Sequence, residues 1–317
     1  MKLSKNIGGK NPPTSPQTHR FAYLLSDETF KVVVCTEEHE DIVIGILELL
    51  LPDKHISRIT FLNKEKHGSV VSEKNVTFDL LCMDADTGEE FLVEMQQSNQ
   101  ASYMDRVLTY STYPVREQME RRLHELIENK DPEGVPSLHK RKMDYTLNPV
   151  YVISLINFEL PHQDARTLED GYISRYELRN GHTGELMTAS LNFVFLEMGR
   201  LRYGAAQWSC CRGRLERLVF LLKHMHELSE VPEGLEDPLL SSLFRASELA
   251  NMKVKERQHY DKIMTTEIDR IAQLDYAQAR GKAEGKAESA KNLKRLGVDE
   301  SVICEATGLT AEEVAAL

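Results

Sequence analysis

The chain has 317 residues, with 39 Lys and Arg against 50 Asp and Glu, which gives a formal net charge of −11. Its hydrophobic fraction of 41% and charged fraction of 28% are those of a globular protein and exclude a disordered or fibrous chain. No run approaches the roughly 18 consecutive apolar residues that a membrane helix requires, and the acidic balance excludes a surface coated in positive charge, although a local patch bridged by metal ions can still bind nucleic acid.

The start of the chain is polar and contains Pro12, Pro13 and Pro16, so we expect residues 1–25 to form a flexible leader. This segment lacks the apolar centre of a signal peptide. The five cysteines show no CxxC spacing. Together these features predict a cytoplasmic protein with reduced thiols.

The pattern from Ser26 onward predicts two helical stretches, the first capped by Asp27 and the second ending at Pro52. Three strand-like runs follow, at Arg58–Leu62, Asn75–Met83 and Glu90–Gln96. The sequence between the last two is a strong hairpin signal because it contains Asp-Thr-Gly.

A helical pattern over Tyr103–Lys130 separates this hairpin from a fourth apolar run, Asn148–Phe158, and Leu191–Leu196 can add a further strand. The order of helix, three strands, helix and strand predicts an α/β fold, a mixed sheet core flanked by helices. We expect this domain to cover residues 26–204.

The remainder of the chain is mostly helical by pattern. We expect a helical extension over residues 205–280, then a repetitive helix and a small helical cap over 281–317. Thr310 is the expected N-cap of the last helix, with Glu313 as its capping-box partner. The last 21 residues contain no Lys or Arg, so an oligomerisation or regulatory cap is a better interpretation of them than direct DNA reading.

Two acids occupy unusual positions, because Asp79 lies inside VTFDLLC and Glu94 inside FLVEMQ. A carboxylate in a buried strand costs several kcal/mol unless a cation or hydrogen-bond donors satisfy it. Strand periodicity places Glu94 and Gln96 on one face. A four-residue hairpin loop would set Asp79 opposite Glu94 and a two-residue turn would set it opposite Gln96, whereas a three-residue loop would turn it to the other face.

Facing carboxylates form a hard, anionic site suited to Mg²⁺ or Mn²⁺. A metal ion there can activate water and stabilise the charge on a phosphodiester during cleavage. Glu73 shares the face of Asp79 if the strand is unbroken, and Glu65, Lys66 and Lys74 lie near the start of that strand, where they can supply further ligands or a phosphate contact.

The helix that follows the hairpin carries Tyr103, Arg106, Tyr110 and Tyr113 at spacings of three or four, which places them on one stripe. In one interpretation, Arg106 and Tyr110 approach the scissile phosphate or the Gln96 side of the pocket. In the other, the stripe packs on the sheet. The sequence leaves both open.

The segments FDLLCMDADTGEEFLVEMQ, DETFKVVV, YSTYPVREQ and LNPVYVISLINF resemble the recombination-promoting nucleases, which are transposase-associated members of the PD-(D/E)XK nuclease superfamily. The resemblance implies a restriction-endonuclease-like fold and metal-dependent endonuclease activity on DNA. It places the first metal-binding acid on Asp79, the second on Glu94 and the third motif position on Gln96.

The wider superfamily has a Lys where this chain has Gln96, which leaves open whether Lys74 or Lys66 supplies the missing charge. Our expected catalytic residues are therefore Asp79, Glu94, Gln96 and Lys74, and our expected metal ligands are Asp79, Glu94, Glu65 and Glu73. For an acid from the first helix, the candidates are Glu37, Glu38, Glu48 and Glu65.

The sequence is compatible with two alternatives. Gln96 in place of Lys, together with the net charge of −11, also suits a catalytically weakened nuclease-fold protein that acts as a binding or assembly module. The same acids could equally cleave RNA.

Overall fold

The computed structural model describes residues 19–62, 65–66, 76–128, 145–164 and 168–317. The chain divides into two compact units, the first ending at Tyr260 and the second spanning Asp261–Leu317. The first unit is built around a six-stranded mixed sheet with the strand order β1-β4-β5-β6-β8-β7. These strands are β1 (Ile59–Phe61), β4 (Leu80–Asp84), β5 (Glu90–Gln96), β6 (Val150–Ile156), β7 (Ile173–Glu177) and β8 (Leu191–Glu197).

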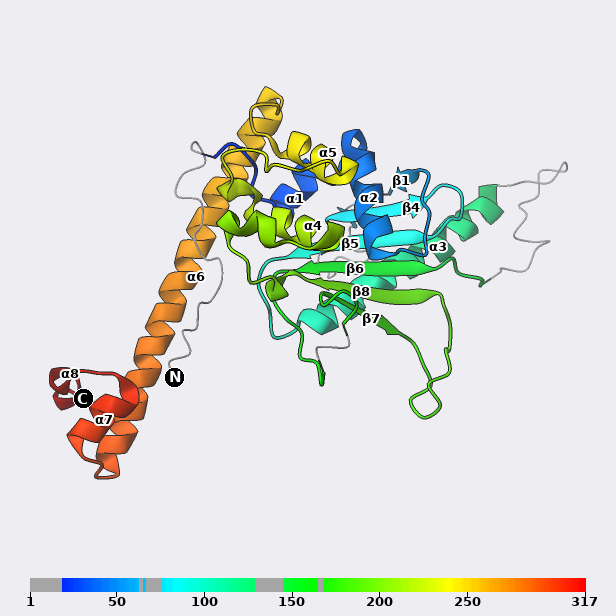
Figure 1. Cartoon of the computed structure of the whole chain (residues 1–317). Helices are drawn as coiled ribbons and strands as arrows, with labels where there is room; N and C mark the ends of the chain where they lie inside the picture. The colour runs from blue at the N-terminus through cyan, green and yellow to red at the C-terminus, as the bar shows by residue number, and fades with distance from the viewer. Residues whose placement is uncertain (1–18, 63–64, 67–75, 129–144, 165–167) are drawn as a thin grey trace, which may run out of the picture. The chain divides into compact units, whose positions relative to one another are not determined.

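Helices cover both faces of this sheet, with α3 on one side and the other helices of the unit on the opposite side (Figure 1). They are α1 (Asp27–Val33), α2 (Glu40–Leu50), α3 (Tyr103–Glu128), α4 (Gly213–His224) and α5 (Pro238–Ser247). The predicted α/β fold, a mixed sheet flanked by helices, is confirmed.

The first helix begins one residue earlier than the sequence pattern indicated. Ser26, and not Asp27, is the N-cap of α1, because its extended backbone lets its side chain accept a hydrogen bond from the Thr29 amide. Asp27 instead lies in the first helical turn, where its negative charge interacts favourably with the helix dipole.

Strand direction determines which ends of the strands meet. The strands β5, β6 and β8 run parallel, so Gln96, Ile156 and Glu197 end at the same edge of the sheet. The start of β4 lies at that edge too, because β4 runs antiparallel to β5. The outer strand β7 pairs antiparallel with β8 and was not among the expected strands. A separate pair, β2 (Glu65–Lys66) and β3 (Val76–Thr77), is not part of this sheet.

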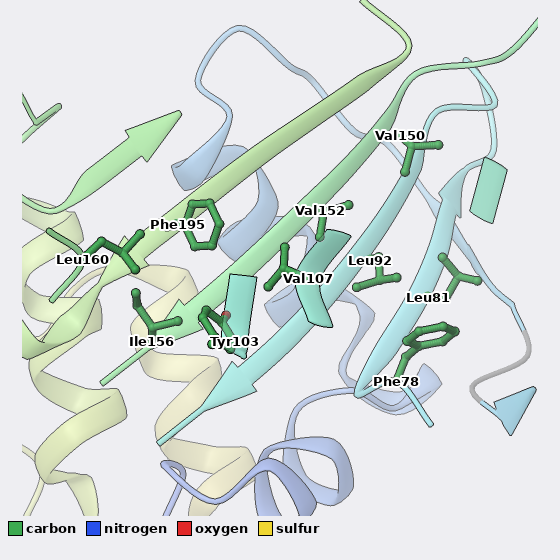
Figure 2. Close-up of a cluster of buried hydrophobic side chains, with 10 residues drawn as sticks. All are labelled: Phe78, Leu81, Leu92, Tyr103, Val107, Val150, Val152, Ile156, Leu160 and Phe195. Atoms are coloured by element: carbon green, nitrogen blue, oxygen red, sulfur yellow. The ribbon is translucent and has the colours of Figure 1, made fainter. Parts of the chain in front are cut away.

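The hydrophobic core on the α3 side of the sheet consists of side chains from the strands, their flanking segments and this helix. Figure 2 shows its ten buried members, which are Phe78, Leu81, Leu92, Tyr103, Val107, Val150, Val152, Ile156, Leu160 and Phe195. Burying such side chains contributes about 1.5–3 kcal/mol each. This packing fixes α3 against the strands that carry the two acids.

The segment before α1 also belongs to the folded unit. Phe21 and Ala22 are fully buried, and the Ala22 amide donates a hydrogen bond to the Ser247 carbonyl at the end of α5, at 2.8 Å. The expected leader boundary at residue 25 is therefore wrong, because the apolar run Phe21–Leu25 is buried in the folded unit. Residues 1–18 lie outside the described residues.

The second unit has a small core of its own. The helix α6 (Val254–Arg295) crosses the unit boundary and is followed by α7 (Glu300–Thr307) and α8 (Ala311–Ala315). Ala290, Ile303 and Val314 are its fully buried members. The expected helical C-terminal region is confirmed, whereas its division at residues 204 and 280 stays a prediction.

The capping box expected at the last helix is present. The Glu313 amide donates to Thr310 Oγ1 at 3.2 Å, and the Thr310 amide donates to Glu313 Oε2 at 2.8 Å. Among the helices that the structure describes, none combines the length and apolar character needed to cross a bilayer.

Gly199 allows a turn after β8 to approach the backbone that follows β6. A Cβ atom at Gly199 would lie 2.6 Å from the Phe158 Cα, and backbone yields less readily than a flexible side chain. We expect Gly199→Ala to lower the free energy of unfolding by about 1–3 kcal/mol in urea titrations. In the control Gly281→Ala, the new Cβ meets nothing within 4 Å, so this exposed site on α6 should gain up to about 1 kcal/mol. Wild-type stability of Gly199→Ala would contradict the close approach.

Candidate active site

The hairpin register places the two strand acids opposite each other. Leu80 of β4 pairs with Val93 of β5, so the preceding Asp79 faces Glu94. The Asp84 amide donates to the Glu89 carbonyl at 2.9 Å and closes the four-residue loop between them. This is one of the two registers that bring the acids to the same face.

The carboxylate of Asp79 occupies a gap between the two strands. Regular β4 begins only at Leu80, while β5 continues to Gln96, so the strands separate at this point. Asp79 Oδ2 accepts a hydrogen bond from the Met95 amide at 2.7 Å, and Glu94 Oε1 accepts one from the Asp79 amide at 3.4 Å. Each acid is therefore held by the backbone of the other's strand.

Burial makes this pair of carboxylates hard to ionise. It raises the pKa of Asp79 to about 7, against which the Met95 hydrogen bond and Lys31 act only in part. The pKa of Glu94 is raised well above its usual value, first by burial and then by the charge of Asp79, although some of its surface stays accessible. Two such groups side by side need a shared proton or a cation near neutral pH.

The helix α1 adds two charged side chains to the site. Lys31 Nζ lies 3.7 Å from Asp79 Oδ1, and the Lys31 side chain is 25% exposed. Asp27 lies one turn earlier on the same helix face, and its charge contributes to the raised pKa of Asp79. Sequence reasoning assigned neither residue to the site, although both belong to DETFKVVV, one of the segments that carry the family resemblance.

Arg106 of α3 holds the side chain of Gln96. Its guanidinium donates hydrogen bonds to Gln96 Oε1 and, at 3.3 Å, to Gln100 Oε1. The guanidinium carbon lies 5.4 Å from the ring centroid of Tyr103 and 5.7 Å from that of Tyr110, so it sits between two aromatic rings. The side-chain amide of Gln96 cannot rotate freely while it accepts from this fixed arginine.

The aromatic stripe of α3 packs on the sheet and also reaches the site, so each of the two interpretations that the sequence left open applies to part of it. Tyr103 is buried in the core, while Tyr110 and Tyr113 contact Phe78 edge to face, with ring centroids 5.4 and 5.5 Å away. Burial raises the pKa of Tyr110, and the charge of Glu94 raises it further. Packing thus holds the stripe in place, while Arg106 reaches the site.

Several expected site residues lie where their side chains are not described. Glu65 and Lys66 are in β2, and Glu65 pairs through its backbone with Thr77. Glu73 and Lys74 fall outside the described residues. The roles expected for Glu65 and Glu73 as metal ligands, and for Lys74 in catalysis, stay predictions.

Two of the acids considered for the first-helix position interact with other parts of the structure. Glu38 forms an ion pair with Lys253 at 2.6 Å. Glu48 accepts a hydrogen bond from the Ile56 amide at 3.0 Å. On α1 itself, the acid whose charge acts on Asp79 is Asp27.

The donor set at Asp79 and Glu94 fits a small divalent cation. Mg²⁺ takes oxygen ligands and is usually held by one or two carboxylates, with water and substrate phosphates completing its coordination. A pair of desolvated carboxylates supplies that number of protein ligands. Within the described ranges, no group of three or more His, Cys, Asp or Glu could hold a metal on its own. Asp79 and Glu94 would thus hold the ion together with water and substrate oxygens.

The mixed sheet, with two acids from adjacent strands at one edge, is the core of a PD-(D/E)XK-type nuclease. The family model of the PD-(D/E)XK nuclease family transposases matches residues 24–277, which is most of the chain. The chain belongs to this family. No curated protein and no solved structure matches it. Membership supports a nuclease or transposase type of function and implies DNA binding, and PD-(D/E)XK nucleases generally use divalent metal ions.

Proposed function

We propose that the protein is a metal-dependent DNA endonuclease of the recombination-promoting, transposase-associated type, which hydrolyses phosphodiester bonds at Asp79 and Glu94. The observation that carries this proposal is the meeting of these two desolvated acids between strands that separate: Glu94 accepts a hydrogen bond from the Asp79 amide, and Asp79 accepts one from the Met95 amide. A purely structural ion pair would need a full cationic partner for each acid, yet the pKa of Asp79 remains raised beside Lys31, and that of Glu94 remains raised although Arg106 and Lys31 both lower it.

Divalent metal, Mg²⁺ or Mn²⁺, would activate water and stabilise the charge that develops on the phosphodiester. The Met95 amide holds Asp79 Oδ2, so the other oxygen, Oδ1, is directed to the site. Gln96 cannot supply a charge, but its Oε1 has two lone pairs, and Arg106 uses one of them. The second can accept a hydrogen bond from the attacking water and orient it. Arg106 is thus a positioning residue for Gln96.

Cleavage of supercoiled plasmid by the full chain tests the proposal. The wild type should nick or linearise the plasmid with Mg²⁺ or Mn²⁺ and stop with EDTA, and Asp79→Asn should lower the rate at least about 100-fold. The control is Asp84→Asn at the far end of the same strand. Asp84 is 2% exposed and accepts hydrogen bonds from Asp86 and Thr87, which an asparagine can still satisfy in part. This control should cut at the wild-type rate.

Equal cutting by Asp79→Asn and the wild type would remove Asp79 from the mechanism. A wild-type chain that binds Mn²⁺ and DNA but cuts neither DNA nor RNA would favour the alternative, a catalytically weakened binding or assembly module. Selective cutting of RNA would keep the site and change the substrate.

We further propose that the protein acts in the cytoplasm.

We also propose that the helical C-terminal region joins copies of the chain. The middle of α6 supports this association, because Leu274 and Tyr276 are apolar or aromatic side chains that are 49% and 69% exposed. Light scattering of the full chain, compared with Leu274→Lys, tests it. A monomer at all concentrations would contradict the association.

A further inference from the structure

We propose that Lys31 of α1 is a catalytic residue whose ammonium group binds a non-bridging oxygen of the scissile phosphate, and so supplies the positive charge that the motif Glu94-x-Gln96 lacks. The proposal rests on the proposed function, because it names a further residue of that same site.

The short helix α1 fixes Lys31 beside both acids. Ser26 caps this helix, and Phe30 and Val33 are buried beneath it. The remaining face presents Lys31, whose Nζ lies 3.7 Å from Asp79 Oδ1. Its charge lowers the pKa of Asp79 and, at longer range, that of Glu94, although burial outweighs it at both. The charge of Arg106 also lowers the pKa of Glu94, so Lys31 is chiefly the cation of Asp79.

A charge count shows what changes when the site is loaded. With Asp79 and Glu94 ionised, Lys31 is the cation that pairs with Asp79, while Arg106 acts on Glu94 at longer range and Asp27 adds a negative charge near Asp79. A divalent cation bound by the pair neutralises both, and the ammonium group is then no longer needed by the carboxylates. A phosphodiester brings one negative charge and gains more as it is attacked, so the released positive charge of Lys31 has a partner in the substrate.

Arg106 cannot bind the scissile phosphate in the same way as Lys31. Hydrogen bonds to Gln96 and Gln100 and the rings of Tyr103 and Tyr110 fix its guanidinium beside Gln96. By contrast, the Lys31 side chain is partly exposed, and within the described part of the chain its ion-pair partner is Asp79 alone. A flexible lysine can turn from the carboxylate to a bound phosphate.

The experiment compares Lys31→Met and Lys31→Arg with the wild type. Cleavage rates are measured at saturating Mn²⁺, Mn²⁺ affinity by calorimetry and folding by thermal melts. We expect Lys31→Met to bind Mn²⁺ at least as tightly as the wild type, because a competing cation is gone. Its cleavage rate should nevertheless fall about 100-fold. Lys31→Arg keeps the charge and should recover part of the rate.

The matched control is Lys54→Met. Lys54 forms an ion pair with Glu89 at 2.6 Å and is 28% exposed, close to the 25% of Lys31, but Glu89 lies at the opposite end of the hairpin from Glu94. Loss of this ion pair should leave the cleavage rate at the wild-type value.

Three results would overturn the proposal. In the first, Lys31→Met cuts as fast as the wild type or faster, which means that Lys31 only neutralises Asp79; the proposed function then stands. In the second, the cleavage rate of both Lys31 variants falls by the same factor as the fraction of folded protein, which assigns Lys31 a structural role. In the third, the wild type shows no metal-dependent cleavage, and the proposed function falls with it.

Discussion

The metal-free protein is expected to lose stability as the pH rises from about 4 to about 7, because of Asp79. The folded-state pKa of this carboxyl is raised from 3.8 to about 7 by burial. Between these values the folded protein binds a proton that the unfolded chain has released. Each increase in pH therefore favours the unfolded state, and the free energy of unfolding declines through this window. Glu94 acts in the same direction, since its pKa is raised too.

The size of the effect follows from the shift. A change from 3.8 to about 7 corresponds to a loss on the order of 4 kcal/mol once the window is crossed. His226 acts oppositely, since burial lowers its pKa from 6.5 to about 4 and its contribution is lost as the pH falls. The difference between the wild type and Asp79→Asn isolates the carboxyl. We expect the metal-free variant to be the more stable protein at pH 8, with the two nearly equal at pH 4.

Urea titrations at pH 4 to 8, with EDTA and with Mg²⁺, provide the measurement. A cation that binds the ionised pair stabilises the folded state, so Mg²⁺ should restore wild-type stability at pH 8 and have little effect at pH 4. Asp79→Asn should respond weakly to Mg²⁺. Parallel pH curves for the two metal-free proteins would show that Asp79 is ordinarily ionised, in contradiction to the raised pKa.

Replacing Glu197 by alanine is expected to destabilise the protein by about 3–5 kcal/mol. Glu197 is fully buried at the end of β8, where it accepts hydrogen bonds from the Leu160 amide at 3.0 Å, Ser174 Oγ at 3.1 Å and Arg200 Nε at 2.9 Å. It also shares a hydrogen bond of 2.5 Å with His162. Its removal leaves these donors, one of them charged, without their acceptor.

The control for this substitution is Glu177→Ala on the neighbouring strand β7. The ion pair of Glu177 with Arg179 is 36% and 48% exposed, respectively, so its loss should cost less than about 1 kcal/mol. Urea titrations of both variants provide the comparison. A similarly small loss for Glu197→Ala would show that the buried carboxylate contributes little net stability.

The sequence predicted the central hairpin and its neighbours well, because their apolar runs are long and bounded by clear turn residues. The run Glu90–Gln96 coincides with β5, and Leu191–Leu196 lies within β8. The strand β7 was missed because only its first two residues are buried, and its polar remainder gives little strand signal. The run Asn75–Met83 is interrupted at Phe78 and Asp79, since the Asp79 carboxylate takes the place of a backbone acceptor for Met95.

At the site, sequence spacing brought Asp79, Glu94 and Gln96 together but could not fix the register among three hairpin loops. It also pointed to Arg106, whose spacing within the aromatic stripe is visible without coordinates. Lys31 was not found, because its contact with Asp79 depends on how α1 lies beside β5. Contacts between distant segments depend on tertiary packing that a helical pattern does not contain.

The split use of the Asp79 carboxylate bears on ion selectivity. One oxygen is committed to the Met95 amide at 2.7 Å, and the other already faces an ammonium group at 3.7 Å. A sodium or potassium ion carries the same single charge as that ammonium group. Replacing the ammonium group by such an ion would therefore not increase the electrostatic attraction to the carboxylate. At physiological concentrations, Na⁺ and K⁺ should therefore compete poorly with divalent cations for binding to these carboxylates.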